Sequence, residues 1–316
     1  MRVIGVFNRD GGTFKTTDMD AFAATAVEVF AAHGHALEVR VVDGKNLIAE
    51  LKRAASDGQM LVAGGGDGTI SAAASVAYEA GIPLGVLPAG TMNLFARSLG
   101  LPLRPDEALE AIAGGGLQRV DIATVNGRPF IHQFSVGIHP KLVKLRGQLS
   151  YKSRIGKMIA STRAAFGAIL NPPSFAVDVL ANGRLERRFT AGLSVSNNPF
   201  DEGHLPLADH LDRGVLGLYF VPPLSLGVAF RLAFGLLRGK FRSLPEVVEK
   251  EAREATIFFP HKKYGSAGVI DGELITLPDR VDLKIHPQAL QVVVPKAPAA
   301  SAEEERAALA KLLTSA

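Results

Sequence analysis

The stretch Leu61-Val62-Ala63-Gly64-Gly65-Gly66-Asp67-Gly68-Thr69-Ile70 decides the fold of this chain. A short apolar run stops at three glycines and an Asp-Gly-Thr, and an alanine-rich helical pattern follows from Ser71 to Ala80. This order predicts a strand, a turn and a helix N-terminus. Glycines let an anion approach successive backbone N–H groups, and the helix N-terminus adds partial positive charge. The turn therefore suits a polyphosphate, and Thr69 is the expected helix cap.

Asp67 strengthens the interpretation of this turn as a ligand site. A carboxylate among phosphate-binding amides is unfavourable unless Mg²⁺ or a substrate hydroxyl accompanies the phosphates. The stretch has neither the Gly-Lys-Ser/Thr ending of a P-loop nor the spacing G-x-G-x-x-G of the dinucleotide fingerprint. One alternative stays open, in which the glycines only let a strand pack against a helix.

Similar strand, loop and helix units lie on both sides of this stretch. Residues 2–7 read as a strand that ends at a second glycine turn, 8–13, before a helix over 19–33. Further strands are expected at 37–42 and 83–87, and the second of these ends at Pro88-Ala89-Gly90-Thr91-Met92-Asn93. The alternation predicts a parallel sheet, whose strands bring three loops together at their carboxyl ends. Thr91 and Asn93 would contact the same ligand there, or serve only as helix caps.

The pattern changes to a mainly antiparallel β domain at about residue 120. Turns such as Asn126-Gly127 and Asn182-Gly183 separate the expected strands, which lie at 120–125, 129–137, 175–180, 187–195, 215–221, 255–259 and 281–285. Two basic helical insertions, 141–170 and 224–242, interrupt them. A last strand is expected at 290–294 and a surface helix at 301–313. We therefore expect domains over residues 1–119 and 120–287, and then a segment 288–316 whose strand returns towards the first domain.

The composition indicates a globular protein of the cytoplasm. The chain has 316 residues, of which 47% are hydrophobic and 21% charged, and it has no cysteine. Disulfides and cysteine metal sites are therefore excluded, and a reducing compartment fits. The N-terminus is too poor in apolar residues for a signal peptide. The uncharged run 214–230 contains two prolines and is shorter than the roughly 20 apolar residues that cross a membrane.

The positive charges are concentrated in one segment. No Asp or Glu lies between Asp121 and Asp178, although eight basic residues do: Arg128, Lys141, Lys144, Arg146, Lys152, Arg154, Lys157 and Arg163. This segment is either a solvated helix face or a contact with anionic lipid, to which each basic side chain contributes about 1 kcal/mol. Nucleic acid is not expected as a partner, because no aromatic platform or recognisable nucleic-acid module is present.

Four strings together carry a family resemblance: FNRDGGT, GGGDGTI, LPAGTMNLFARSLG and VIDGELI. In this order they resemble the diacylglycerol kinase catalytic-domain family, which includes sphingosine kinases and bacterial lipid kinases. The resemblance runs from about Arg2 to Pro295. It implies an α/β fold with a Rossmann-like parallel-sheet nucleotide domain, followed by a β-rich, antiparallel sandwich-like lipid domain with helical insertions. It also implies that ATP binds in the cleft, with Mg²⁺.

The resemblance also assigns roles to individual residues. Glu273 would be the general base that takes the proton of the substrate hydroxyl, and Asp271 beside it would orient the hydroxyl or bind metal. Taken alone, however, the Asp-Gly-Glu segment also fits an ordinary hairpin turn. The expected nucleotide contacts are Asn8, Gly11, Gly12 and Thr13 in the first loop, Gly64, Gly65, Gly66, Asp67, Gly68 and Thr69 in the second, and Thr91 and Asn93 in the third.

The chain departs from the family pattern at three places. Ser71-Ala72 stands where many members have Asn-Glu, and Asn93-Leu94 stands where they have Asn-Asp. Many members also carry a D-D-G-x-L-D string whose outer aspartates hold a structural Mg²⁺. Here the string is Asp212-Arg213-Gly214-Val215-Leu216-Gly217, so we expect the metal site at Asp212 to be weak or absent.

We therefore expect an ATP-dependent lipid kinase that phosphorylates a hydroxyl of a diacylglycerol-like or sphingoid lipid. It would act as a peripheral protein at the inner membrane face, with basic segments 141–163 and 231–242 on the anionic surface. Exposed edge strands in the second domain would allow a homodimer. Two alternatives stay open. NAD kinase shares the GGDGT turn, and the altered Ala72 and Asp212 positions would also fit a catalytically silent nucleotide- or lipid-binding regulator.

Overall fold

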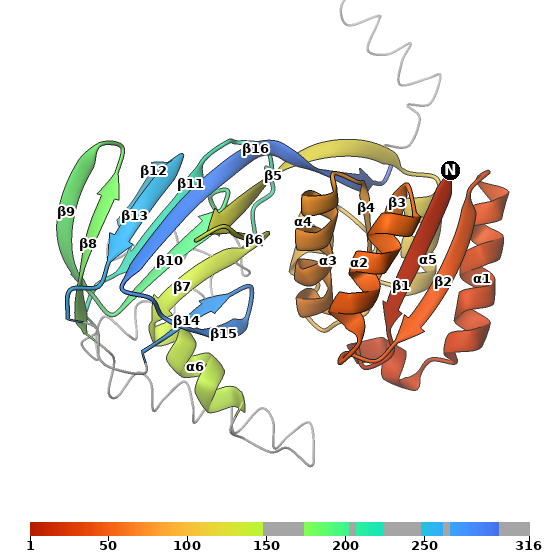
Figure 1. The fold of residues 1–316 in the computed structure, drawn as a ribbon, viewed down its shortest axis with the longest axis horizontal. Coiled ribbons are helices and arrows are strands. Elements are labelled where there is room, and N and C mark those ends of the chain that lie inside the picture. The colour runs from red at the N-terminus through yellow and green to blue at the C-terminus, as the bar shows by residue number, and fades with distance from the viewer. Residues whose placement is uncertain (148–173, 202–206, 224–247, 262–265, 297–316) are drawn as a thin grey trace, which may run out of the picture.

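The computed structural model describes residues 1–147, 174–201, 207–223, 248–261 and 266–296. The expected tail helix and most of both basic insertions lie outside the described residues. Within the described ranges, the chain forms an α/β half and a β-rich half that share one long sheet (Figure 1).

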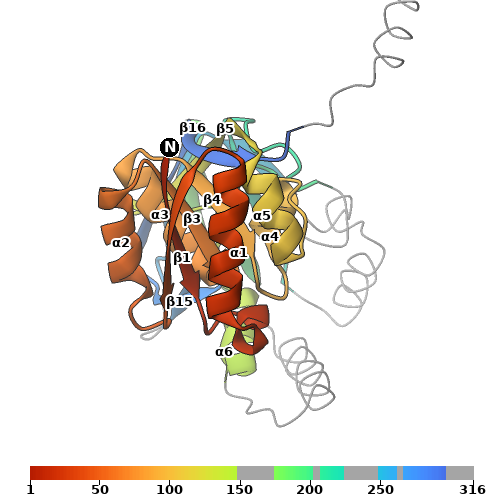
Figure 2. The ribbon, with the colours of Figure 1, turned by 90° about the vertical axis from the view of Figure 1, so that its right-hand side faces the viewer.

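The α/β half contains four parallel strands in the order β2-β1-β3-β4, as the sequence predicts. Their bounds are β1 Arg2–Asn8, β2 Ala36–Val42, β3 Met60–Gly65 and β4 Leu84–Pro88. Helices α1 (Met19–Ala32) and α5 (Pro105–Ala113) pack together on one face, and α2 (Leu47–Asp57) and α3 (Asp67–Ala80) on the other (Figure 2). The short helices η1 (Gly12–Thr16) and α4 (Leu94–Ser98) lie in the loops that follow β1 and β4. Every residue of β3 and β4 is buried, which explains their continuous apolar pattern.

The β-rich half contains two sheets. The long sheet continues from β4 through β16 (Arg280–Val294), β13 (Glu254–Phe258) and β8 (Phe175–Ala181) to β9 (Arg184–Thr190), while β5 (Gly116–Val125) and β6 (Arg128–Phe130) branch from β16. The second sheet has the order β12-β11-β10-β7-β14-β15. Its strands are β7 Gln133–Gly137, β10 Gly192–Asn197, β11 Leu216–Val221, β12 Val248–Ala252, β14 Ala267–Ile270 and β15 Glu273–Thr276. Helix α6 (Ile138–Gly147) follows β7.

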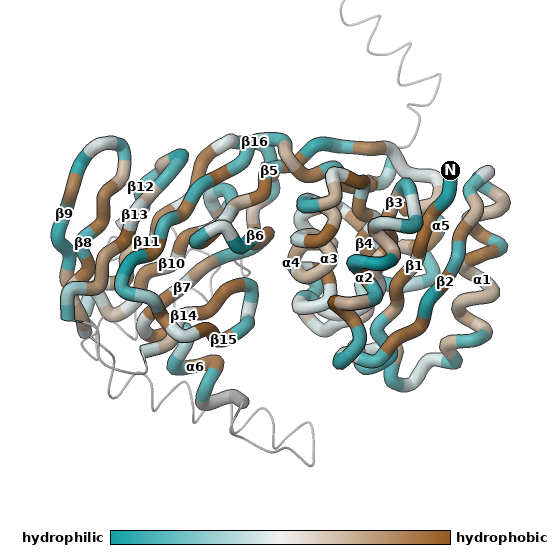
Figure 3. The backbone as a smooth tube through the Cα atoms, in the orientation of Figure 1, coloured by the Kyte–Doolittle hydropathy of each residue, from teal (hydrophilic) through white to brown (hydrophobic). Residues whose placement is uncertain are grey.

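Two hydrophobic cores correspond to the two halves. One joins the helices of the α/β half to β1, β3 and β4, and the other lies between the two sheets of the β-rich half. Figure 3 shows the apolar strands of both halves as brown segments. The antiparallel sandwich expected for the second half is therefore present, and its turns at Asn126-Gly127 and Asn182-Gly183 have the positive φ angles typical of tight hairpins.

Several expected strands differ from the observed ones. The expected strands 129–137 and 187–195 are each two strands, β6 with β7 and β9 with β10. The expected strands 281–285 and 290–294 are instead one strand, β16, whose pairing with β5 shifts between His286 and Leu290. The expected domain limits at 119 and 287 both fall inside continuous strands, β5 and β16, so that division of the chain stays a prediction.

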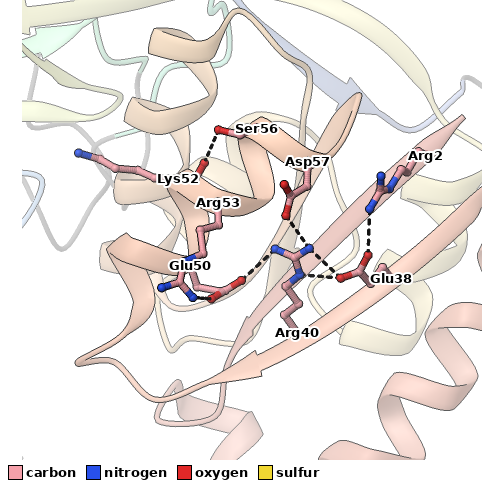
Figure 4. A network of polar contacts seen from close by, with 8 residues as sticks. All are labelled: Arg2, Glu38, Arg40, Glu50, Lys52, Arg53, Ser56 and Asp57. Carbon is pink, nitrogen blue, oxygen red and sulfur yellow. Dashed lines mark hydrogen bonds and ion pairs between the residues drawn. The ribbon is translucent and has the colours of Figure 1, made fainter.

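A charged network fixes α2 on the edge strand β2. The guanidinium of Arg40 bonds Glu38, Glu50 and Asp57 at 2.7 to 2.9 Å, as Figure 4 shows. Arg40 is largely buried, and its hydrogen bond and charge hold the pKa of the Glu38 carboxyl below its usual range. The network matters for the site because α2 also forms one wall of the depression described below.

Candidate active site between the two halves

The three loops that follow β1, β3 and β4 meet in space, as expected. The amide of Thr13 donates to the carbonyl of Ala89 at 2.8 Å, and the amide of Ala89 donates to the carbonyl of Gly65 at 2.8 Å. These bonds join the first loop to the third and the third to the second. The carboxyl ends of the parallel strands therefore present one continuous surface formed by all three loops.

Close packing of the loops explains some of the glycines. A Cβ atom on Gly12 would lie 2.2 Å from the carbonyl oxygen of Ala89, and one on Gly90 would lie 2.6 Å from the Cα atom of Gly66. A Cβ atom on Gly65 would meet Thr69 at 2.5 Å. Gly66 is less crowded, and Gly68 has no neighbouring atom within 4 Å of the Cβ position. The exposed Gly68 is therefore not required by internal packing, and its open side is available to a ligand.

Asp67 connects the second loop to the third. It is the first residue of α3, and its Oδ1 and Oδ2 atoms accept from the amides of Leu94 at 2.6 Å and Asn93 at 3.0 Å. These amides form the N-terminus of α4, so Asp67 caps that helix from outside. Its negative charge is thereby stabilised by two backbone amides of the protein itself.

Three further predicted nucleotide contacts, Asn8, Thr69 and Asn93, have side-chain partners within the protein. Asn8 donates through Nδ2 to the hydroxyl of Thr69 at 3.0 Å and accepts from the amide of Asp10 at 3.0 Å. Asn93 bonds both the amide and the carbonyl of Gly90 through its side chain. Thr69 is buried inside α3, so the prediction that it caps this helix is wrong: the N-cap is Gly66, with no side-chain cap. These side chains fix the loops, whereas Thr91 is exposed at the tip of the third loop.

Asp271 accepts four hydrogen bonds, three within the β-rich half and one from α3 of the other half. Its Oδ1 atom accepts from the amides of His132 at 3.0 Å and Gln133 at 2.9 Å. Its Oδ2 atom accepts from the amide of Ile131 at 3.0 Å and from the hydroxyl of Ser71 on α3 at 2.6 Å. A carboxylate has about four acceptor positions, so these donors use its capacity fully. The geometry therefore gives Asp271 a positioning role.

Glu273 is the freer carboxylate of the same hairpin. Its side chain is 63% exposed and forms an ion pair with Arg128, which is 49% exposed. Both line a depression of about 470 Å³ that lies between the two halves. Its other lining residues come from α2, α3 and the two hairpin turns: Ile48, Lys52, Gly68, Ser71, Ala72, Ser75, Val76, Glu79, Gly127, Pro129 and Asp271. Gly68 of the glycine turn and the Asp-Gly-Glu hairpin therefore line the same depression.

Three residues that line this depression, Lys52, Ser71 and Arg128, are not among the site residues expected from the sequence. In the sequence, Ser71 stands out only as a departure from the family pattern, and Arg128 only as one charge of a basic segment. One signal for Ser71 was available, because Gly68, Ser71 and Ser75 recur at the helical spacing that places small side chains on one face of α3. No local pattern identifies Arg128, because its partner is distant in the sequence.

Asp212, the position where we expect a weak or absent structural metal site, does not line this depression. Asp212 is exposed, and no group of three or more His, Cys, Asp or Glu side chains that could hold a metal is found within the described ranges. The next residue, Arg213, forms an ion pair with Glu251 at 2.7 Å. The amide of Gly214 donates to the fully buried Asp121 at 2.6 Å, and Asp121 also accepts from the amide of Gln288 at 2.8 Å.

His132 lies beside this site in a shielded position. The residue as a whole is half-buried, but its Nε2 atom is buried and has no hydrogen-bond partner among the described residues. Burial lowers the pKa of His132 below its ordinary value of 6.5, and the charges of Asp271 and Asp67 offset part of this effect. Burial likewise lowers the pKa of His139, and repulsion from His132 adds to this effect.

We expect the stability of the protein to fall as the pH drops below about 6.5. The unfolded chain then binds protons that the folded His132 and His139 still exclude, which favours unfolding by up to about 1.4 kcal/mol per pH unit for each histidine. Urea unfolding between pH 8 and 5 measures this slope. His132→Gln should reduce the change in unfolding free energy per pH unit by the contribution of one histidine. The exposed control His33→Gln should leave this change as it is in the wild type. An unchanged slope in His132→Gln would contradict the assignment.

Comparison with known proteins agrees with this architecture. The family model of the diacylglycerol kinase catalytic domain matches residues 2–125. A Xanthomonas oryzae protein named "Probable lipid kinase YegS-like" is 32% identical over 262 residues, which are 74% of this chain and 79% of that one. The Bacillus subtilis protein named diacylglycerol kinase is 27% identical over 241 residues, 69% of this chain and 75% of the relative.

Other matches extend to the fold and to longer proteins. Two crystal structures from Bacillus anthracis, one of them described as a diacylglycerol kinase, superpose with TM-scores of 0.74 and 0.67 at 20% and 17% identity. Each alignment covers 93% of this chain, and the alignments cover 95% and 97% of the two structures. An uncharacterized protein of Synechocystis is 35% identical over 127 residues, which are 38% of this chain and only 29% of that protein.

The fold, with an α/β half and a β-rich half, and the named relatives therefore define a lipid kinase class. The chain belongs to the diacylglycerol kinase family, together with the YegS-like lipid kinases. The resemblance that rests on the four sequence strings is confirmed.

Proposed function

We propose that the protein transfers the γ-phosphate of ATP to a hydroxyl of a lipid at the membrane surface. One observation carries this proposal. Gly68 of the phosphate-binding turn and Glu273 of the Asp-Gly-Glu hairpin line the same depression between the two halves. A phosphoryl donor bound at the turn would lie on the same side of the molecule as a carboxylate that can accept the acceptor's proton.

The individual residues suit phosphoryl transfer. Gly66 and Gly68 lie at the N-terminus of α3, a helix of 14 residues that favours negative charge at this end. Lys52 and Arg128 bring positive charge to the edge of the same depression. Catalysis of phosphoryl transfer consists mainly of positioning and charge stabilisation, with a carboxylate to orient and deprotonate the hydroxyl. Glu273 is exposed and lies in the depression, so it could orient and deprotonate the acceptor hydroxyl.

The residues present fit a magnesium ion only as part of the nucleotide complex. The Asp271 carboxylate already has four donors, and Asp67 accepts from two amides. Mg²⁺ prefers several waters and phosphate oxygens with only one or two carboxylates. We propose that it arrives with ATP, with Asp67 as the nearest protein carboxylate to the phosphate turn, and neutralises charge on the phosphates.

The acceptor and the membrane surface belong to the same proposal. Within the described residues, no helix is long and apolar enough to cross a membrane. Lys141 and Lys144 of α6 begin the first basic segment, 141–163, while its residues 148–163 and all of 231–242 lie outside the described residues. We propose peripheral binding to anionic lipid at the inner membrane face, which brings a diacylglycerol-like or sphingoid hydroxyl to the depression.

The test is transfer of labelled γ-phosphate from ATP, with Mg²⁺, to a panel of acceptors. The panel contains dispersed diacylglycerol, a sphingoid base and NAD⁺. Labelled lipid made by the wild type but not by Glu273→Gln would support the proposal and identify the acceptor. Labelled NADP would indicate NAD kinase instead. If the protein binds ATP but labels no acceptor, even in a total lipid extract, the result would favour a catalytically silent binding protein.

A substitution at Gly68 separates nucleotide binding from folding. Gly68→Ala should leave stability equal or raise it by at most about 1 kcal/mol, because alanine has the better helix propensity and meets no neighbouring atom. The added methyl group should obstruct the phosphates and weaken ATP binding by about tenfold or more. Urea unfolding and calorimetric titration with Mg·ATP measure the two effects.

The matched control for this substitution is Gly116→Ala. Gly116 also has open space at its Cβ position but lies at the start of β5, away from the depression. The Gly116→Ala protein should bind ATP as tightly as the wild type. Equal ATP affinity in Gly68→Ala and the wild type would contradict the placement of the phosphates.

A further inference from the structure

Strand β9 is the last strand of the long sheet. In the part of the chain that the structure describes, β8 is its one partner strand. β9 spans 7 residues, pairs with β8 without a register shift and contains no proline. Leu185 and Phe189 on it are 66% and 69% exposed. Proteins normally shorten, bend or cover such an edge, because its free backbone groups pair readily with another strand.

The hairpin geometry fixes which backbone groups of β9 are free. Ala181 and Arg184 flank the two-residue turn, so they form a hydrogen-bonded pair, and such pairs alternate along an antiparallel ladder. Residues 184, 186 and 188 therefore direct their amides and carbonyls towards β8. Leu185, Arg187 and Phe189 direct theirs away from β8, to the open edge.

The side chains of β9 are complementary to a second copy of the same strand. In an antiparallel pair centred on Arg187, Leu185 lies opposite Phe189, and Glu186 lies opposite Arg188. Apolar and opposite-charge pairs of this kind stabilise neighbouring strands. A pair centred on Glu186 would instead place Glu186 opposite itself and Arg184 opposite Arg188. The side chains thus select the register that the free backbone groups also permit.

The remaining like-charge contact is already compensated. Arg187 would meet Arg187 of the second copy, but each guanidinium is held by Asp178 on β8 through bonds of 2.6 and 2.7 Å. This bond keeps the pKa of Asp178 below its usual value, so the carboxylate stays charged at neutral pH. The centre of the interface would therefore contain two compact ion pairs.

We propose that the protein forms a symmetric homodimer in which β9 pairs with β9 of a second copy, antiparallel and centred on Arg187. The two long sheets then become one continuous sheet. The two-fold axis is perpendicular to the sheet, so both copies present the same sheet face to the same side. This proposal does not depend on the kinase activity.

Sedimentation equilibrium over a range of protein concentrations tests the oligomeric state. The wild type should be dimeric, and Phe189→Lys should shift it to monomer. Leu117→Lys is the matched control, because Leu117 is 57% exposed but lies on β5. A wild type that is monomeric at every concentration overturns the proposal. So does a dimer that Phe189→Lys leaves unchanged.

A second pair of variants isolates the backbone contact. Arg187→Pro removes an amide that points away from β8, whereas Arg187→Ala keeps this amide and loses the same side chain. The proline variant should dissociate at least about tenfold more readily than the alanine variant, because a symmetric dimer loses two hydrogen bonds. Circular dichroism checks that both are folded. Equal dissociation constants for the two folded variants overturn the backbone pairing.

Disulfide trapping tests the register, since the natural chain has no cysteine. Two Arg187→Cys chains would bring their Cα atoms to about 5.5 Å, which a disulfide can span. Two Arg184→Cys chains would lie about 20 Å apart. Oxidation should therefore link the first variant into a covalent dimer and not the second. Equal linking of both would overturn the register.

Discussion

Glu273→Gln should abolish most phosphoryl transfer while the protein stays as stable as the wild type. The amide keeps the size of the side chain but cannot accept the proton of the acceptor hydroxyl, so kcat should fall by about 10²- to 10⁴-fold. ATP binding should persist, because Glu273 lies on the hairpin and not in the glycine turn. Stability should change little, because Glu273 is exposed and its ion pair with Arg128 is solvated.

The measurements are single-turnover phosphate transfer to the acceptor lipid that the panel identifies, calorimetric titration with Mg·ATP and urea unfolding. Glu28→Gln, an exposed substitution on α1, is the control and should behave as the wild type. Full activity in a folded Glu273→Gln protein would remove Glu273 from the role of general base. Loss of both ATP binding and activity would show that Glu273 takes part in nucleotide binding.

Asp271→Asn, unlike Glu273→Gln, should cause a large loss of stability. The Asp271 carboxylate accepts from three backbone amides and from Ser71. An asparagine oxygen can replace Oδ1, but its NH₂ group would face the amide of Ile131, donor against donor. Leaving a shielded amide without an acceptor costs about 1 to 3 kcal/mol, and loss of the charge-assisted bonds adds to this.

Urea unfolding should therefore show a midpoint well below that of Glu273→Gln. Asp282→Asn is the matched control, because Asp282 lies on the exposed side of β16 with partners on its own sheet. Activity should fall in Asp271→Asn because the clash between the NH₂ group and the amide of Ile131 displaces the hairpin that carries Glu273. A stable but inactive Asp271→Asn protein would instead give Asp271 a direct part in the chemistry.

The α/β half could be predicted from local sequence because each unit carries its own signals. Apolar runs of strand length end at glycine turns, and alanine-rich helical patterns follow. The order of the elements and the meeting of their loops can therefore be predicted without knowledge of contacts between residues far apart in the sequence. Asp67 shows the limit of this reasoning. Its position in the turn predicts a ligand contact, but its bonds to Asn93 and Leu94 depend on how the third loop returns to the second.

The connections of the β-rich half could not be predicted in this way. β16 looks like two strands in the sequence, because Pro287 and Gln288 interrupt its apolar alternation. In the structure the strand continues through this point, where Gln288 has a positive φ of 51°. The Asp-Gly-Glu segment looks like an ordinary hairpin turn, and the φ angles of Asp271 and Gly272 confirm that it is one. What distinguishes it is the bond from Asp271 to Ser71, which is 200 residues away in the sequence.

The irregularity in β16 has a mechanical consequence. β16 pairs with β13 before residue 286 and with β4 at Val292, so one strand carries hydrogen bonds of both halves. A regular ladder resists bending, whereas the pairing of β16 with β5 shifts register between His286 and Leu290, an irregularity of the kind at which strands bend. We expect a rotation that narrows or widens the depression to bend β16 mainly at this point, where buried Asp121 accepts from the amide of Gln288. The stiffness of one short backbone segment, far from Glu273, would then govern how readily the two halves close around their substrates.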